Sequence, residues 1–256
     1  MYKLIASDMD GTFLNSVGKV SNNSAEYIKD LKEFMFVPTT GREVGFIKET
    51  LEGLNINYII ACNGAIIYDN KNDEIIYKSI IKESVYKDIL EAIKDMTARV
   101  EFQFFSGDIM LNNSESLSFI NSLEKDVYKM NLYFENETDY HFCANKFEKI
   151  DSEFYYIKNP DGSSHSIEIV AKGNSKKTGI KRLAEILKVE EYEIIAIGDS
   201  ANDIPMFEVA GLSVAMQNAP ESIKEVADLV TYKNNDNDGV IDFIEKELLE
   251  KASNVE

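Results

Sequence analysis

Short apolar runs that end in polar clusters recur toward both ends of the chain, and no other feature of the sequence restricts the fold as strongly. Such runs occupy residues 3–7, 36–40, 58–62 and 193–197. Strands of a parallel sheet are buried on both faces and therefore read as continuous apolar runs, and ligands bind beyond their carboxyl ends. The pattern predicts a parallel sheet with functional loops along one edge.

Helical patterns separate these runs, so that strand and helix alternate at both ends of the chain. Apolar residues recur at helical spacing over residues 21–36, 43–54 and 176–187. Pro38 lies inside the run 36–40 and cannot donate a hydrogen bond to a neighbouring strand. A short or locally irregular strand is therefore expected there.

The middle of the chain lacks this alternation. A hairpin pattern over residues 65–78 comes first, and residues 82–171 then give a helix, two strands around Gly107 and a weaker alternation. Strands and helices without a βαβ order indicate an antiparallel α+β unit. The prediction is an α/β protein in which a Rossmann-like parallel sheet core, residues 1–81 and 172–256, carries an inserted α+β cap, residues 82–171.

The composition restricts the partners of this chain. Its 256 residues include 27 Lys and Arg against 45 Asp and Glu, a formal net charge of −18, so nucleic acid is not an expected partner. No run approaches the roughly 18 apolar residues of a membrane helix, and no secretory signal pattern is found. Cys62 and Cys143 lack disulfide or metal-ligand spacing, which favours a cytoplasmic location. Any phosphate site must be built locally from backbone N–H groups, a few cations and a metal.

Two carboxylates follow the first predicted strand, in the segment Asp8-Met9-Asp10-Gly11-Thr12. Gly11 permits a turn in which the two carboxylates converge. One carboxylate could attack phosphorus, while the other gives a proton to the leaving group and later takes one from water. An acidic turn without catalytic function is the alternative for this segment taken alone.

A second acidic cluster, residues 198–203 with the sequence GDSAND, follows the predicted strand 193–197 and opens a helix. Two carboxylates and an amide at a strand end suit a hard cation such as Mg²⁺. The alternative is helix capping by Asp199, with Asp203 favoured by the helix dipole. Capping explains one acid rather than the whole cluster.

Two further segments could hold an anion. Thr40-Gly41-Arg42 ends the second predicted strand and offers a hydroxyl, a close backbone approach and the start of a helix just beyond. Lys176 and Lys177 open another helix, where the dipole disfavours cations, so an anionic partner is expected for one of them. A capped helix start and a solvated lysine pair are the alternatives.

The order of these segments resembles the haloacid dehalogenase (HAD) superfamily, and specifically the Cof-type phosphatases with a type IIB cap. The resemblance runs nearly from end to end and extends to residues 62–65 (CNGA), 214–219 (VAMQNA) and 238–240 (DGV). It departs at Lys177, where the family usually has glycine, and at Pro38, where the family has a hydrophobic residue.

The resemblance implies a role for each acidic residue. Asp8 is the expected nucleophile and a Mg²⁺ ligand, and Asp10 is the general acid/base whose backbone carbonyl also touches the metal. Asp199 completes the protein ligands, and Asp203 stands behind it and orients the site.

The resemblance also implies a phosphate site. Lys176 is the expected catalytic lysine, although Lys177 could substitute for it. Arg42 and Asn63 are expected near the leaving group. The remaining groups that would hold the phosphoryl group are Thr40, Gly41, Asn202 and the backbone N–H groups that follow Asp8, beginning with Met9.

The predicted function is Mg²⁺-dependent hydrolysis of small phosphorylated metabolites, sugar phosphates or similar compounds, through an aspartyl-phosphate on Asp8. A phosphomutase of the same superfamily is the alternative enzyme. A non-catalytic protein that binds a phosphorylated ligand is the alternative outside enzymes, and the presence of both Asp8 and Asp10 argues against it.

Overall fold

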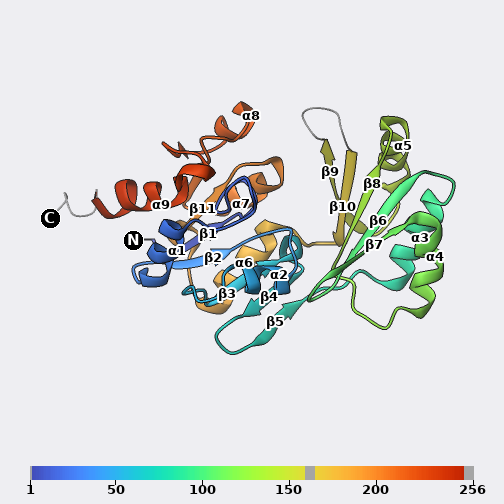
Figure 1. Ribbon diagram of the computed structural model, residues 1–256, viewed down its shortest axis with the longest axis horizontal. Helices are drawn as coiled ribbons and strands as arrows, with labels where there is room; N and C mark the ends of the chain where they lie inside the picture. The colour runs from blue at the N-terminus through green and yellow to red at the C-terminus, as the bar shows by residue number, and fades with distance from the viewer. Residues whose placement is uncertain (1, 159–164, 251–256) are drawn as a thin grey trace.

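The protein is described by a computed structural model that covers residues 2–158 and 165–250. Two sheets organise it, one on each side of the molecule in Figure 1. Residue 1 and residues 251–256 of the predicted core, and residues 159–164 of the predicted cap, lie outside the described residues. Within the described part of the chain, no helix is both long and apolar enough to cross a membrane.

The first sheet is parallel throughout and confirms the predicted α/β class. Its five strands run in the order β13-β12-β11-β1-β2. The strand β2 ends at Pro38, which pairs with Ser7 of the neighbouring strand, so the proline closes a short strand. The bounds are β1 Leu4–Ser7, β2 Met35–Pro38, β11 Ile194–Gly198, β12 Leu212–Ala215 and β13 Leu229–Val230.

A small antiparallel sheet continues this one beyond β2. An isolated parallel bridge joins Thr39 to Ile60 of β3, and β3 pairs with β4, which pairs with β5. The hairpin β4–β5 corresponds to the hairpin expected over residues 65–78. The bounds are β3 Tyr58–Ala61, β4 Ile66–Asp69 and β5 Glu74–Lys78.

Helices cover both faces of the parallel sheet. Ile5 and Ile195 point to one face and pack with Ile28 of α1 and Phe243 of α9, whereas Leu4 packs on the other face with α6 and α7. The bounds are α1 Asn22–Asp30, α2 Val44–Thr50, α6 Lys176–Leu187, α7 Ile204–Phe207, α8 Glu221–Lys224 and α9 Gly239–Phe243, which a π-helical segment Ile244–Glu250 prolongs.

The helix expected over residues 21–36 is shorter than predicted. It ends at Asp30, and Met35 and Phe36 belong to β2 instead. The helical spacing of Met35 misled the prediction because Met35 lies about two helical turns after Ile28 and so falls in register with the apolar face of the helix, although it belongs to the next strand.

The second sheet is antiparallel and is built from the middle of the chain, in the order β7-β6-β8-β10-β9. Figure 1 shows it between the parallel sheet and the helices α3, α4 and α5. The bounds are α3 Glu83–Ile93, β6 Ala98–Gln103, β7 Asp108–Asn112, α4 Asn113–Phe119, β8 Lys129–Phe134, α5 Glu137–Phe147, β9 Ser152–Lys158 and β10 His165–Ala171.

The two faces of this antiparallel sheet differ in polarity. Val100, Phe102, Met130 and Leu132 are buried in one cluster with apolar residues of the three helices. Alternate residues of the same strands must point to the opposite face. That face carries polar side chains and, together with the carboxyl edge of the parallel sheet, encloses the cavity described below.

Candidate active site

The acidic residues that end β1 and β11 meet at one edge of the parallel sheet. The two strands are neighbours, with Ser7 opposite Ile197, and the N–H of Asp8 donates to the carbonyl of Ile197 at 2.9 Å. Asp8 and Asp199 therefore leave the sheet side by side, although they are far apart in the sequence. Parallel pairing of adjacent strands is what brings their ends together.

Lys176 connects this edge to the helix α6, whose first residue it is. Its side chain is 2% exposed, and Nζ donates to Oδ1 of Asp8 and to Oδ1 of Asp203, each at 2.5 Å. Burial lowers the pKa of Lys176, but the charges of Asp203 and Asp8 outweigh burial and raise it. Lys177 points elsewhere and pairs with Glu208 at 2.7 Å on the surface. Of the two lysines, the structure places only Lys176 beside the acids.

Asp203 is fully buried and both of its oxygens are engaged. Oδ1 accepts from Lys176, and Oδ2 accepts from the N–H groups of Asp199 and Ser200, each at 2.9 Å. A Cβ at Gly198 would lie 2.5 Å from the Cβ of Asp203, so only glycine fits beneath it. Asp203 thus fixes both the loop after β11 and the position of the lysine.

The carboxylates of Asp8, Asp199 and Asp203 form a cluster that could hold a metal ion, since one oxygen from each lies within 4.8 Å of the others. Burial raises the pKa of Asp8 well above its ordinary value despite Lys176, and burial together with Asp203 raises the pKa of Asp199 to about 6. Three carboxylates face one ammonium group here. The donor set is all oxygen, and the excess of negative charge fits a hard divalent cation.

Gly11 lets the loop after β1 approach this cluster. Its φ of +78° suits glycine, and a Cβ there would lie 2.5 Å from Oδ2 of Asp199. Thr12, in the same loop, donates its hydroxyl to Oδ1 of Asp199 at 3.1 Å. The loop therefore both contacts and orients the carboxylate.

Asp10 stands apart from the carboxylate cluster. Its two oxygens accept from Nε and Nη2 of Arg42, each at 2.9 Å, in a bidentate ion pair. The guanidinium group also lies 4.9 Å from the ring centre of Phe46. The side chain of Asp10 is thus held at the cavity wall, and only its backbone carbonyl remains a predicted metal ligand.

The segment that follows β2 lines the cavity, and the helix start just beyond it is capped by a side chain. Thr40 is buried and its hydroxyl accepts from the N–H of Arg42 at 3.1 Å. The helix α2 begins later than predicted, at Val44, and the carboxylate of Glu43 caps its first N–H groups. The alternative of a capped helix start is therefore what the structure shows, because the carboxylate of Glu43 already occupies this helix N-terminus.

The other predicted phosphate-site residues fall in different places. Asn202 lines the cavity and accepts from the hydroxyl of Ser200 at 2.5 Å. Met9 is fully buried and is not among the residues that line the cavity. Asn63 is buried, has a φ of +51° and donates to Glu168 of β10 at 2.7 Å. It is not among the residues that line the cavity.

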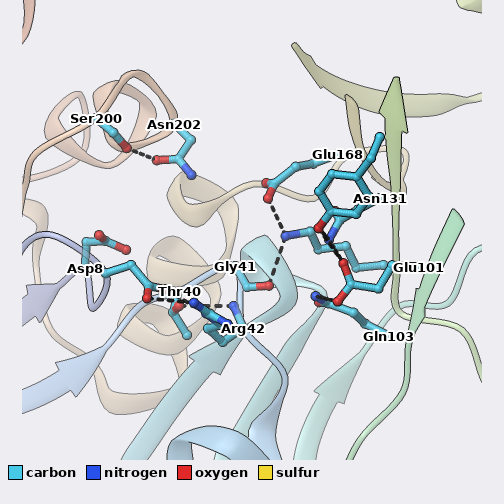
Figure 2. Close-up of a pocket in the computed structure, with 13 residues that line it drawn as sticks. Asp8, Thr40, Gly41, Arg42, Glu101, Gln103, Asn131, Glu168, Ser200 and Asn202 are labelled. Carbon is cyan, nitrogen blue, oxygen red and sulfur yellow. Dashed lines mark hydrogen bonds and ion pairs between the residues drawn. The ribbon is translucent and has the colours of Figure 1, made fainter. Parts of the chain in front are cut away.

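A cavity of about 490 Å³ lies between the parallel sheet edge and the polar face of the antiparallel sheet. Figure 2 shows the two groups of side chains opposite each other. No sequence motif points to the residues from the antiparallel sheet, and the alternation of polar with apolar residues along β6 and β8 is the signal that could have found them. The lining residues are Asp8, Asp10, Thr40, Gly41, Arg42, Ser200 and Asn202 on one side, and Glu101, Gln103, Lys129, Asn131, Tyr133 and Glu168 on the other.

Comparisons with known proteins agree with this arrangement. The family model of haloacid dehalogenase-like hydrolases matches residues 5–244. A 5-amino-6-(5-phospho-D-ribitylamino)uracil phosphatase of Bacillus subtilis is 29% identical over 95% of this chain and 97% of its own. Another B. subtilis protein, named phosphatase YwpJ, is 28% identical over 91% of this chain and 96% of its own.

Solved structures show the same fold. A haloacid dehalogenase-like hydrolase from B. subtilis superimposes with a TM-score of 0.79 at 27% identity and covers 96% of this chain and 100% of its own. The HAD subclass IIB sugar phosphatase BT4131 superimposes with a TM-score of 0.76 at 23% identity, covering 95% of this chain and 98% of its own.

The chain belongs to the haloacid dehalogenase-like hydrolase family. The predicted family and fold class are confirmed, and the predicted class of enzyme, a phosphoric monoester hydrolase, is confirmed by the family and by the relatives named as phosphatases.

Proposed function

We propose that this chain is a Mg²⁺-dependent phosphatase that hydrolyses small phosphorylated metabolites through an aspartyl-phosphate on Asp8. The observation that carries the proposal is the buried lysine shared by Asp8 and Asp203, with Asp199 at their side. A buried ammonium group beside a carboxylate lets that carboxylate approach an anionic phosphate, since it offsets their repulsion.

The reaction has two steps in which the chain's own groups act. An oxygen of Asp8 forms a bond to phosphorus while the bond from phosphorus to the leaving-group oxygen breaks, and Asp10 gives that oxygen a proton. Water then attacks phosphorus, Asp10 takes its proton, and the bond to Asp8 breaks to release phosphate. The guanidinium group of Arg42 engages both carboxylate oxygens of Asp10. Asp10 must therefore break at least one of these hydrogen bonds before it can contact the leaving-group oxygen.

The metal would be held by Asp8, Asp199 and the backbone carbonyl of Asp10, with Asp203 behind them. A bound Mg²⁺ would neutralise charge on the phosphate oxygens. Asp203 orients the loop of Asp199 through two backbone hydrogen bonds and holds Lys176 in place. Loss of either contact would misplace a group that touches the phosphate.

The remaining groups position the phosphoryl group and enclose the substrate. We assign the phosphate oxygens to Lys176, Thr40, Gly41 and Asn202, together with the backbone N–H groups that begin at Met9. Residues 82–171 would act as the cap, and residues 1–81 and 172–256 would act as the catalytic core. Only a small substrate would fit between them. The cavity volume of about 490 Å³ is in the range of small-molecule sites.

The test is the release of inorganic phosphate from an aryl phosphate with and without Mg²⁺. Wild-type protein should release phosphate only with the metal, and Asp8→Asn should lose roughly 10⁴-fold in kcat because an amide is not a nucleophile toward phosphorus. Circular dichroism of the variant controls for folding. Normal turnover by Asp8→Asn would reject the mechanism. An isomeric sugar phosphate as the product, without free phosphate, would instead indicate a phosphomutase.

A further inference from the structure

The wall of the cavity formed by the antiparallel sheet carries a cluster of polar side chains around Glu101. Glu101 and Gln103 lie on the same face of β6, and Asn131 and Tyr133 lie on the adjoining face of β8, where Glu101 is paired in register with Asn131. In Figure 2, Glu101, Gln103 and Asn131 stand across the cavity from Asp8. It therefore lies where the part of a substrate remote from the phosphate would be.

The carboxylate of Glu101 organises its neighbours. It accepts from the hydroxyl of Tyr133 at 2.6 Å, from Nδ2 of Asn131 at 2.7 Å and from Nε2 of Gln103 at 3.1 Å. Burial raises the pKa of Glu101, but hydrogen bonds with Asp108, Tyr133 and the two amides outweigh it and lower the pKa, while the contact with Glu101 raises the pKa of Asp108. Glu101 is thus an ionised acceptor at neutral pH.

This arrangement fixes which amide atoms remain available. An ionised carboxylate can only accept hydrogen bonds, so both amide groups must turn their NH₂ toward Glu101. Oδ1 of Asn131 and Oε1 of Gln103 are then left without partners among the described residues, although both side chains are more than nine-tenths buried. Buried acceptors of this kind are costly unless a donor reaches them.

The charge on this wall is also uncompensated. The two cations that line the cavity are engaged, Arg42 with Asp10 and Lys129 with Glu168. Within residues 2–158 and 165–250, Glu101 forms no ion pair with a lysine, arginine or histidine. The cap side of the cavity therefore carries a net negative charge at Glu101, beside two acceptor oxygens that have no partner among the described residues.

We propose that the cluster of Glu101, Gln103, Asn131 and Tyr133 selects the leaving group of the substrate by charge and by hydrogen-bond donors. It accepts leaving groups that are rich in hydroxyl or amino donors, and it rejects those that carry a second phosphate or a carboxylate. This inference rests on the proposed phosphatase function. A hydroxyl satisfies the free amide oxygens, whereas an anion can satisfy none of them and is repelled by Glu101.

A matched pair of substrates tests the inference: sorbitol 6-phosphate and 6-phosphogluconate, which differ at the far end by a CH₂OH group against a carboxylate. We expect wild-type kcat/KM to favour the alditol by about 10- to 100-fold, the effect of a like charge about 6 Å away at an effective dielectric constant of about 20. In Glu101→Gln this ratio should fall to within about threefold of one, chiefly through a lower KM for the acid.

Two further variants keep the test decisive. Glu91→Gln, on the exposed side of α3, should keep the wild-type ratio. Gln103→Lys retains a donor to Glu101 and adds a positive charge, so it should also lower the preference in kcat/KM for the alditol over the acid. This variant provides the same test if Glu101→Gln does not fold. A general loss of structure would reduce turnover of both substrates equally and leave the ratio unchanged.

The outcomes separate this inference from the function on which it rests. If the wild type hydrolyses an aryl phosphate but has equal kcat/KM for the acid and the alditol, the proposed selection by Glu101 is wrong, and the proposed phosphatase function is unaffected. An unchanged ratio in folded Glu101→Gln and Gln103→Lys would overturn it equally. If no phosphate is released from any substrate, the aryl phosphate included, the proposed function itself fails.

Discussion

The two walls of the cavity are built in opposite ways. The wall from the parallel sheet consists of charged groups in direct contact, with Lys176 between Asp8 and Asp203. The wall from the antiparallel sheet carries one ion pair, Lys129 with Glu168, beside a larger group of polar side chains that hydrogen bonds arrange around Glu101. The first arrangement suits the handling of a phosphate and the second the recognition of an uncharged group, so the molecule separates chemistry from selection.

Sheet architecture explains this division. Helices cover both faces of the parallel sheet, so that functional side chains can appear only where its strands end. The antiparallel sheet is covered by helices on one face only. The side chains that it contributes to the cavity therefore lie in the middle of strands, at every second position.

Removal of the cation from the parallel-sheet wall should have the largest effect. In Lys176→Met, kcat for an aryl phosphate should fall by about 10³-fold, because the repulsion between Asp8 and phosphate is no longer offset. The free energy of unfolding should fall by about 3 kcal/mol, since buried carboxylates lose their partner. Steady-state kinetics and urea unfolding measure the two effects.

Lys177→Met is the matched control, because it removes a neighbouring lysine whose partner Glu208 lies at the surface. Its kcat should stay within about twofold and its stability within about 0.5 kcal/mol of wild type. Equal losses in the two variants would contradict the assignment of Lys176.

A smaller loss is expected when the approach of the loop to the carboxylates is blocked. In Gly11→Ala, the new Cβ would lie 2.5 Å from Oδ2 of Asp199, so that carboxylate must move. We expect kcat/KM to fall by about 100-fold, the order of effect of a misplaced group, together with a higher Mg²⁺ concentration for half-maximal activity.

Gly18→Ala separates this displacement from backbone strain. Gly18 has a similar φ of +72°, but nothing lies within 4 Å of a Cβ built there. Both substitutions should cost about 1–2 kcal/mol in thermal or urea unfolding, because L-residues disfavour this conformation. If Gly18→Ala loses activity as Gly11→Ala does, strain rather than contact with Asp199 is the cause.

The smallest of these effects should arise from the contact between the two walls. Nζ of Lys129 pairs with Glu168 at 2.6 Å and donates to the carbonyl of Gly41 at 3.1 Å. In Lys129→Met, we expect KM to rise by about 10-fold with kcat within about threefold, because a hydrogen bond that holds the walls together is lost. Lys87→Met, an exposed lysine on α3 that pairs with Glu83, should leave KM unchanged. An unchanged KM in Lys129→Met would show that this contact does not help to form the site.

The parallel sheet was predicted well from the sequence because each of its strands forms a continuous apolar run. The sequence placed β1, β3 and β11 to within one residue, and it anticipated that Pro38 would shorten β2. It left two readings open at the start of α2, an anion cradle and a capped helix start, and the structure shows the cap, which is Glu43. Local propensity identifies a helix start but not which group will cap it.

The antiparallel sheet was predicted far less completely. Residues 113–171 were given only weak alternation, yet they form α4, β8, α5, β9 and β10. Strands that are buried on one face carry a mixed pattern, so their periodicity is weaker than that of fully buried strands. In the sequence, the polar residues that line the cavity cannot be distinguished from ordinary solvent-facing positions. Their role becomes visible only in the structure, where the edge of the parallel sheet lies opposite them.

By itself, the sequence determined which chemical groups follow the strands of the parallel sheet, since hydrophobic patterning and residue type are local properties. Only the tertiary structure decided that Lys176 rather than Lys177 reaches Asp8, and that Glu101 and Asn131 face the same cavity as Asp10. Adjacent residues at a helix start point in different directions, and alternate strand residues point to opposite faces. Which direction or face meets the site depends on packing between segments far apart in the chain.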